Sequence, residues 1–295
     1  MPAWLTFFAP YEFAPTVALV CALALIFFVS GLVRLRAQGE LVGSGRSIAW
    51  FVGLALIYGA LQTHFDYWSQ HIFFVHRVQH LLLHHVAPFL IALSLPGRPL
   101  MAGMPRALRE RVVLPIVRNR AVRGVYNAVQ MPSIAAFLFV GLIYLWLIPA
   151  VHFYAMLNVP LYHAMNWGMA LDGLLFWIMV LDPRPPSGER GGAPGYVRRL
   201  GVLAAVMFPQ IILGAYIGLT GRELYPVYAV CGRIWPVSAM TDQHLGGFIT
   251  WIPAAMMSAI GGVVVLRRWM RNENPAHEEA HVPPQNESRR LQTTA

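Results

Sequence analysis

Residues 71–96 read HIFFVHRVQHLLLHHVAPFLIALSLP, and the rest of the chain is arranged around this stretch. It is apolar and long enough to cross a lipid bilayer as a helix, since about 20 residues suffice. His76, His80 and His84 are spaced so that they share one helical face, forming a ladder roughly 12 Å long. Imidazoles inside a membrane are costly unless they have partners, which marks the ladder as a candidate functional site. In the alternative interpretation the histidines only hydrogen-bond to neighbouring helices and hold the bundle together.

The composition of the chain is that of a polytopic membrane protein. The 295 residues are 57% hydrophobic and 12% charged, whereas soluble domains are about one quarter charged. All of the basic residues are Arg, and they lie in loops between apolar runs. The net charge of +9 therefore reflects membrane topology and does not indicate a nucleic-acid partner. The two cysteines, Cys21 and Cys231, are far apart, so we expect no disulfide framework.

Apolar runs of sufficient length predict an all-α bundle of seven transmembrane helices in one domain, residues 1–266. The expected spans are 14–33, 47–63, 72–95, 133–149, 161–181, 200–220 and 245–266. No Arg precedes the first apolar run, so we expect no cleaved signal peptide there. The tail, residues 267–295, is polar and contains Pro and Glu, and we expect it to be disordered in the cytoplasm.

The arginines predict the orientation of these spans. The loops after the first, third and fifth spans and the start of the tail are rich in Arg, whereas the alternate loops hold only Arg222 and Arg233. By the positive-inside rule, the N-terminus lies outside and the C-terminus lies in the cytoplasm. The outer ends and outer loops then hold further side chains able to contact a metal or ligand: His64, His71, His152, His163, Met156, Cys231, Met240, Asp242 and His244.

The fifth predicted span carries Met165, Met169 and Asp172 on one helical face. Counted from the outer surface, these residues match the depths of the three ladder histidines. Thioether and imidazole together are typical of copper sites, because thioethers select Cu(I) and imidazoles bind either oxidation state. Methionines are also common packing residues between helices, which is the alternative for Met165 and Met169. Asp172 requires a partner at that depth in a membrane.

Three motifs, in matching order, resemble the CtaG family of bacterial cytochrome c oxidase assembly factors, of the multispanning type. They read HRVQHLLLHHVAPFL at 76–90, DGLLFWIMVLDPR at 172–184 and TDQHLGGFITWIP at 241–253. The resemblance implies a multi-pass protein of the bacterial plasma (inner) membrane that matures a haem-copper oxidase by copper delivery or insertion. Its implied partners are oxidase subunits or other assembly factors. The residues at the family's motif positions are His76, Gln79, His80, Asp242 and Gln243.

The chain also departs from the family pattern. Residues 146–149 read WLIP, where many members have a His in a WHxP segment. His152 and His163 are candidate substitutes for that histidine.

The predicted site is a copper site between the second, third and seventh spans. His76 and His80 form its base, because side chains at i and i+4 are neighbours on a helix. His64 or His84 supplies a third nitrogen. A site rich in imidazole and poor in carboxylate argues against Mg²⁺ and Ca²⁺, although Zn²⁺ also binds imidazoles.

Residues at the start of the seventh span complete the predicted site. Asp242 and His244 would close over its mouth, and Gln243 would orient a ligand by a hydrogen bond. Helix capping is the alternative role for Asp242. Arg77 beside the ladder would repel a cation, so the prediction requires its side chain to point away, toward Asp66 or the lipid headgroups.

Two other functions stay open. One is a membrane haem protein with transmembrane histidines as axial ligands, and the other is a transporter that moves copper along the His/Met ladder. A transporter needs ligands that continue into the cytoplasmic half of the membrane. Below His85 the only candidates in the third span are Pro88 and Ser94, and this scarcity of ligands favours binding over transport. The sequence contains no Walker loop, GxSxG or HExxH motif, so we expect a non-enzymatic role.

Overall fold

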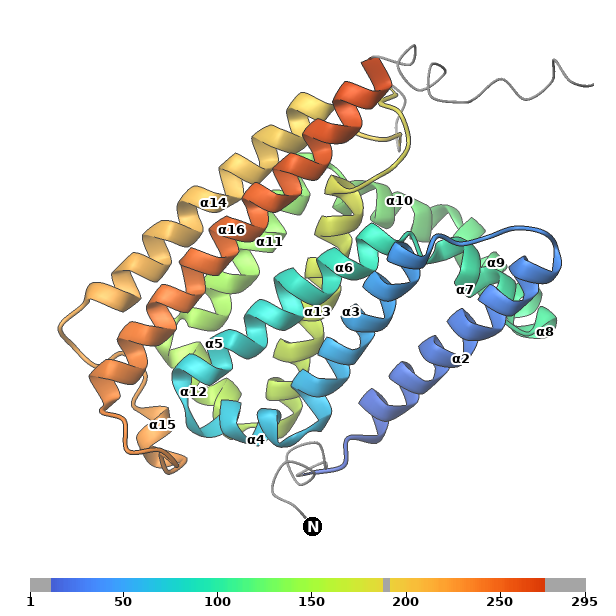
Figure 1. The fold of residues 1–295 in the computed structure, drawn as a ribbon. Coiled ribbons are helices and arrows are strands. Elements are labelled where there is room, and N and C mark those ends of the chain that lie inside the picture. Colours follow the sequence, from blue (N-terminus) through green and yellow to red (C-terminus); the bar gives the residue numbers. More distant parts are fainter. Residues whose placement is uncertain (1–11, 188–191, 274–295) are drawn as a thin grey trace, which may run out of the picture.

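The computed structural model describes residues 12–187 and 192–273, which fold as a bundle of helices (Figure 1). Each of the seven predicted spans coincides with a long helical segment. These are α2 (Pro15–Ala37), α3 (Ser44–Gln62), α5–η1–α6 (Phe73–Leu81, Leu82–Val86, Ala87–Ser94), α11 (Pro132–Leu147), α13 (Val159–Val180), α14 (Tyr196–Leu219) and α16 (Ala239–Glu273). The third segment contains a π-helical turn, η1, in its middle.

Four to six of these segments have the length and composition of membrane spans. α2, α3, α14 and α16 qualify individually, and two bent helix pairs raise the number to six if each pair is one span. α5–η1–α6 bends by 72° into α7 (Gly97–Gly103), and α10 (Arg120–Val129) bends by 73° into α11. α13 has 22 residues, but polar residues such as Asn166 and Asp172 make it less apolar. The described part of the chain is therefore a helical bundle with several helices long and apolar enough to span a membrane, and the count of seven stays a prediction.

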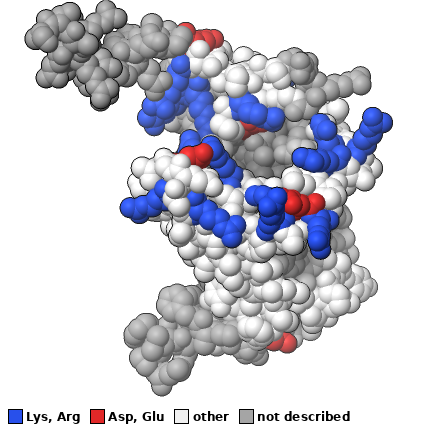
Figure 2. Space-filling view, turned by 90° about the vertical axis from the view of Figure 1, so that its right-hand side faces the viewer, with Lys and Arg blue, Asp and Glu red and all other residues white. Residues whose placement is uncertain are grey.

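The two ends of the bundle differ in their short helices and in charge. One end carries α4 (His64–His71), α12 (Pro149–Leu157) and α15 (Val227–Val230), as Figure 1 shows. The other end carries α7, α8 (Arg106–Leu108), the π-helical η2 (Arg109–Val113), α9 (Leu114–Arg118) and α10. Basic side chains gather at this second end (Figure 2). We call the two ends the α4 end and the arginine-rich end.

Local sequence signals explain where the helices begin. α13 follows Asn158, whose side-chain oxygen accepts the Leu161 N–H at 3.0 Å, and Pro160 fits the first turn because it has no N–H to satisfy. α4 is capped in the same way by Thr63, whose hydroxyl accepts the Phe65 N–H at 3.2 Å. The caps fix the α4 end of the bundle, where the histidine-bearing helix also begins.

The most extensive helix pairing joins α14 and α16. A Cβ atom added at Gly247 would lie 2.3 Å from the backbone nitrogen of Gly218, so only a residue without a side chain permits this approach. The LGG motif at 245–247 therefore serves helix packing at this position. α16 extends past the predicted boundary at 266 as far as Glu273, and the remainder of the predicted tail lies outside the described residues.

Candidate functional site

The histidine-bearing helix begins at a buried carboxylate from the last long helix. The Phe73 and Phe74 backbone N–H groups donate to the two Asp242 carboxylate oxygens at 3.1 and 2.8 Å. Arg233 also donates to this carboxylate at 3.3 Å. Asp242 thus accepts hydrogen bonds from the free N–H groups at the start of α5. Its negative charge also interacts favourably with the positive partial charge at the N-terminus of this helix. Asp242 therefore acts as a helix cap, but it caps α5 and not its own helix, which was the alternative considered from the sequence.

This geometry predicts different outcomes for two substitutions of Asp242. Asp242→Ala leaves two buried N–H groups without an acceptor, which costs about 1–3 kcal/mol for each group. We expect a lower unfolding temperature and less inserted protein. Asp242→Asn keeps one acceptor oxygen and leaves one N–H group unpaired, so we expect a smaller loss of stability and of inserted protein than in Asp242→Ala. A stable Asp242→Asn protein that fails to support its function in cells would show that the charge acts beyond capping.

A π-helical turn changes which histidines face the interior. His76, His80, His84 and His85 are all buried, with relative exposures of 0%, 1%, 0% and 3%. In a regular α-helix two adjacent residues point about 100° apart, so His84 and His85 would not share the ladder face. The extra residue in the turn η1 widens the helix there, and π turns of this kind are frequent at functional sites. Both histidines consequently contribute to the buried column, which we define as His76, His80, His84 and His85.

The inner half of the column is tied to α13 and α11. His84 Nε2 lies 3.0 Å from the Asp172 carboxylate, so the expected match in depth between the ladder and the fifth span is confirmed here. The His84 ring stacks on Phe139 with the centroids 4.0 Å apart, and the His85 ring meets Phe139 edge-on at 5.0 Å. These contacts fix the orientation of both rings.

A further imidazole, that of His152, lies beside the outer half of the column; the sequence named it only as a candidate substitute for a family histidine. The rings of His76 and His80 are 4.4 Å apart, and the His152 ring of α12 lies 5.2 Å from that of His76. His152 Nδ1 bonds to the Trp146 carbonyl at 3.0 Å, and the Tyr228 hydroxyl lies 2.9 Å from its Nε2. Because a carbonyl only accepts, Nδ1 carries the proton and Nε2 accepts from Tyr228. Burial lowers the pKa of His152 to about 3, so the ring is neutral.

Several imidazole nitrogens of the column are buried and have no hydrogen-bond partner within the described residues. Buried polar atoms are almost always bonded, so a cluster of exceptions marks a place where a further atom is expected. These nitrogens are His76 Nδ1, His76 Nε2, His80 Nε2, His84 Nδ1 and His85 Nδ1. Both polar atoms of the Asn166 side chain are also buried without a partner in this part of the chain.

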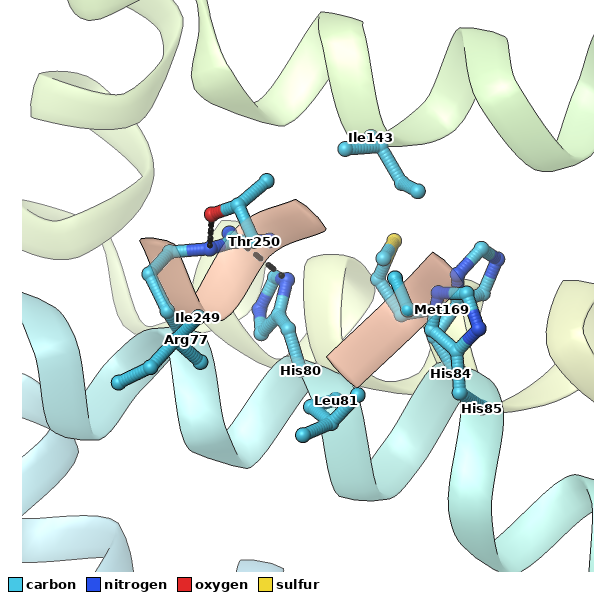
Figure 3. Close-up of a pocket in the computed structure, with 10 residues that line it drawn as sticks. Arg77, His80, Leu81, His84, His85, Ile143, Met169, Ile249 and Thr250 are labelled. Carbon is cyan, nitrogen blue, oxygen red and sulfur yellow. Dashed lines mark hydrogen bonds between the residues drawn. The ribbon is translucent and has the colours of Figure 1, made fainter. Parts of the chain in front are cut away.

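A small cavity of about 10 Å³ lies beside the column, as shown in Figure 3. This volume corresponds to about one water molecule or ion. Its polar and sulfur-containing lining comes from the column, from α13 and from α16, and comprises Arg77, His80, His84, His85, Met169 and Thr250. The cavity therefore brings imidazoles and a thioether together. It lies between α5–η1, α11, α13 and α16, whereas the sequence predicted a site between the second, third and seventh spans. The second predicted span, α3, does not line the cavity.

Arg77 does not point away from the histidines, contrary to the sequence-based expectation. Its Nε donates to Thr250 Oγ1 at 3.0 Å, and its terminal nitrogen lies 3.5 Å from His80 Nδ1. The side chain is buried against α16 and faces the cavity (Figure 3). Asp66, the expected acceptor, is already bonded by other residues, so it does not draw the guanidinium outward.

Asp66 and Gln79 belong to a hydrogen-bond network at the α4 end. Gln79 Nε2 donates to the Asp66 carboxylate at 2.7 Å and to the Ala60 carbonyl at 2.8 Å. The Tyr162 hydroxyl donates to the same carboxylate at 2.8 Å. Burial raises the pKa of Asp66 despite these donors. Gln79 thus joins α5 to α3 and α4, and the same network places Tyr162 next to His76, with the two rings 6.1 Å apart.

The remaining predicted site residues bond mainly to the backbone. Gln243 accepts the Leu224 N–H at 2.6 Å and donates to the Arg222 carbonyl at 3.0 Å, so it holds the turn after α14. His244 Nε2 lies 3.4 Å from the Thr220 carbonyl. His64 begins α4 and is not among the residues that line the cavity. Across residues 12–187 and 192–273, no three His, Cys, Asp or Glu side chains are grouped closely enough to hold a metal ion by themselves.

Sequence reasoning missed His85 as a site residue, and it named His152 only as a candidate substitute for a family histidine. The adjacent pair His84-His85, followed by Pro88, was the available signal for His85. Pro88 has no N–H to bond to the carbonyl four residues earlier, which is that of His84, so a regular helix is already interrupted there. The contact of His152 with His76 could not be predicted, because α12 folds back over the column from a separate part of the chain.

Comparison with known proteins places the chain among membrane assembly factors. Curated relatives include uncharacterised proteins of Mycobacterium leprae, 27% identical over 92% of this chain and 41% of that protein, and of Mycobacterium bovis, 26% identical over 87% of this chain and 39% of that protein. The chain thus spans about two fifths of the length of these relatives. No solved structure matches it. The family model described as cytochrome c oxidase caa3 assembly factor matches residues 26–272, most of the chain, and the chain therefore belongs to this family.

Proposed function

We propose that this assembly factor holds a copper ion in the buried histidine column as a step in maturing a cytochrome c oxidase. The observation that carries the proposal is the set of buried imidazole nitrogens without partners in the described chain, beside a cavity that Met169 also lines. His80 would be the central ligand, because it contacts His76 on one side and shares the cavity with Met169 on the other. Imidazole with thioether favours Cu(I) over the hard cations Mg²⁺ and Ca²⁺.

The chemistry of the surrounding residues suits temporary storage of a cation. The side chains of the column are buried, so an ion there is protected from water. His152, neutral and bonded to Tyr228, could offer its Nε2 lone pair if the hydroxyl turned away. His152 therefore replaces His64 as our preferred third imidazole, and His84 is the less suitable choice because its Nε2 is bonded to Asp172.

Two alternatives are less well supported by the packing. A haem needs a space far larger than the cavity of about 10 Å³ beside the histidines. A copper transporter needs polar ligands that continue through the bundle, whereas Phe89, Ala92, Phe176 and Trp177 form a closed apolar core beyond η1. Binding and delivery from the α4 end therefore agree best with the structure.

The proposed function is tested by the metal content of the oxidase. A strain lacking this protein should accumulate a caa3-type oxidase with haem but with little copper, and excess copper in the medium should partly restore it. An oxidase lacking haem and containing normal copper would contradict the proposal and favour the haem alternative.

The proposed delivery route also requires a specific orientation in the plasma membrane. We expect the arginine-rich end to lie in the cytoplasm and the α4 end outside, because anionic lipid and the insertion machinery retain Arg on the inner side. A reporter enzyme that works only in the cytoplasm should be active when fused after Arg271, and one that works only in the periplasm should be inactive there. Activity of a periplasm-specific reporter at that position would reverse the orientation and place the α4 end in the cytoplasm, the wrong side for delivery outside.

A further inference from the structure

A second cavity, of about 680 Å³, lies at the arginine-rich end, remote from the histidine column. Its walls come from the end of α2, from α7 and from η2. The lining residues are Arg34, Leu35, Gln38, Gly97, Arg98, Met101, Ala102 and Arg109. The cavity therefore combines three guanidinium groups with apolar side chains, and no acidic residue lines it.

The walls of this cavity are held together closely. A Cβ atom added at Gly103 of α7 would lie 1.7 Å from the Phe27 carbonyl oxygen of α2, so the two helices are in backbone contact. Arg34 donates from one nitrogen to the Ala102 and Met104 carbonyls at 2.8 and 3.1 Å. These bonds satisfy carbonyls at the end of α7 and fix one guanidinium at the cavity wall. The Arg34 guanidinium is thus positioned before any ligand binds.

The acidic residues nearby do not neutralise the cavity. Glu40 bonds to Arg98, and Glu110 lies 3.5 Å from Arg109 and also bonds to Arg106. The side chains in these pairs are substantially exposed, and exposed ion pairs contribute little. Arg98 and Arg109 are therefore free to exchange these partners for a more strongly charged anion.

The segment that follows the cavity has the properties of an interfacial helix. None of residues 105–129 is buried in the protein, although many are apolar. In α10, Arg120 and Arg123 lie on one side and Val122, Val125 and Val129 on the other. Apolar side chains left uncovered beside arginines are typical of helices that lie in the headgroup region of a membrane. Figure 1 shows α7 to α10 alongside the ends of the long helices, and Figure 2 shows the arginines of this end.

We propose that the cavity between α2, α7 and η2 binds the headgroup of an anionic phospholipid, with residues 105–129 lying in the interface of the same leaflet. The arginines carry the charge opposite to that of a phosphodiester and supply N–H donors that bind phosphate oxygens in pairs. The apolar part of the lining faces the start of the acyl chains of the bound lipid; it consists of Leu35, Met101 and Ala102. Basic pockets between transmembrane helices recognise such headgroups in this way. The inference does not depend on copper binding.

Native mass spectrometry of the full-length protein in detergent tests this proposal. With equal amounts of phosphatidylglycerol and phosphatidylcholine, we expect one phosphatidylglycerol to be retained per chain, preferred by about tenfold. The double substitution Arg98→Gln with Arg109→Gln should abolish the preference. The matched control, Arg267→Gln with Arg271→Gln, removes the same charge from exposed residues outside both the cavity and residues 105–129 and should keep the preference. Arg34 is left unchanged because it holds α7.

A second variant separates the cavity from its charge. Met101→Trp retains all arginines but fills the space beside them, and it should also lose the bound lipid while helicity and gel-filtration behaviour stay normal. The proposal is overturned by equal retention of both lipids in the wild type, by a preference that survives the double substitution, or by an equal loss in the control. Displacement of the lipid by an equal concentration of inorganic phosphate would identify a free-anion site instead.

Discussion

Gly173→Ala is expected to destabilise the protein more than any other single methyl addition near the column. The residue lies on α13 opposite η1, and an added Cβ would meet the His84 carbonyl oxygen at 2.3 Å and the His84 Cα at 2.9 Å. These are backbone atoms, so no side-chain rotation relieves the overlap. Overpacking of this kind costs about 1–3 kcal/mol or more. The helices must separate, and the bond of 3.0 Å between His84 and Asp172 should break.

The matched control for this change is Gly168→Ala on the same helix. There the nearest atom to an added Cβ is a Leu142 methyl carbon at 3.8 Å, an ordinary contact. Replacing Gly by Ala in a helix favours the helix by about 1 kcal/mol, so this variant should be as stable as the wild type or more so. Thermal unfolding in detergent measures both. Equal unfolding temperatures for the two variants would show that α13 and η1 are less tightly packed than described.

Arg77→Gln is expected to raise the affinity for Cu(I) by about tenfold or more. A guanidinium at about 5 Å from a monovalent cation repels it by about 3 kcal/mol at an effective dielectric of about 20. Arg77 faces the cavity and lies 3.5 Å from His80 Nδ1, so its charge acts directly on an ion held by the column. Gln can still bond to Thr250. In the wild type, the positive charge of Arg77 would keep copper weakly bound and ready for release to the oxidase.

Competition with a Cu(I) chelator measures this affinity. Arg199→Gln is the control, because it removes another buried guanidinium, one that bonds to the Pro194 carbonyl at 2.8 Å near the arginine-rich end. We expect Arg199→Gln to lower stability and to leave copper affinity unchanged. An unchanged or weaker affinity in Arg77→Gln, with normal folding, would mean that the ion does not sit beside the cavity.

Local patterns were sufficient to predict the long helices and their relative depths. Apolar length and flanking Arg residues are properties of the chain itself, so each predicted span coincides with a helical segment. Depth counting also placed Asp172 opposite His84, because two straight helices in one bundle rise by the same distance per residue. The membrane count was less predictable, because α13 buries polar residues that lower its hydropathy.

The partners of polar residues were not predictable from the sequence. Asp242 caps a helix that begins far away in the chain, and Gln243 bonds to a turn in another connection. Such pairings depend on which helices become neighbours. Arg77 turned toward Thr250 for the same reason, since helical spacing allows several directions and only the position of α16 selects one. The π turn that brings His85 inward arises from tertiary packing as well as from Pro88.

Copper stoichiometry of the purified protein tests the copper proposal most directly. The wild type, loaded anaerobically with Cu(I) and washed, should retain one copper per chain. His76→Ala with His80→Ala should lower the affinity by about tenfold for each lost ligand, leaving little copper. His71→Ala with His163→Ala is the control, since it removes two imidazoles at the α4 end that do not belong to the column. The account predicts that only the first pair loses copper. A correctly folded His76→Ala, His80→Ala protein that still retains one copper per chain would contradict it.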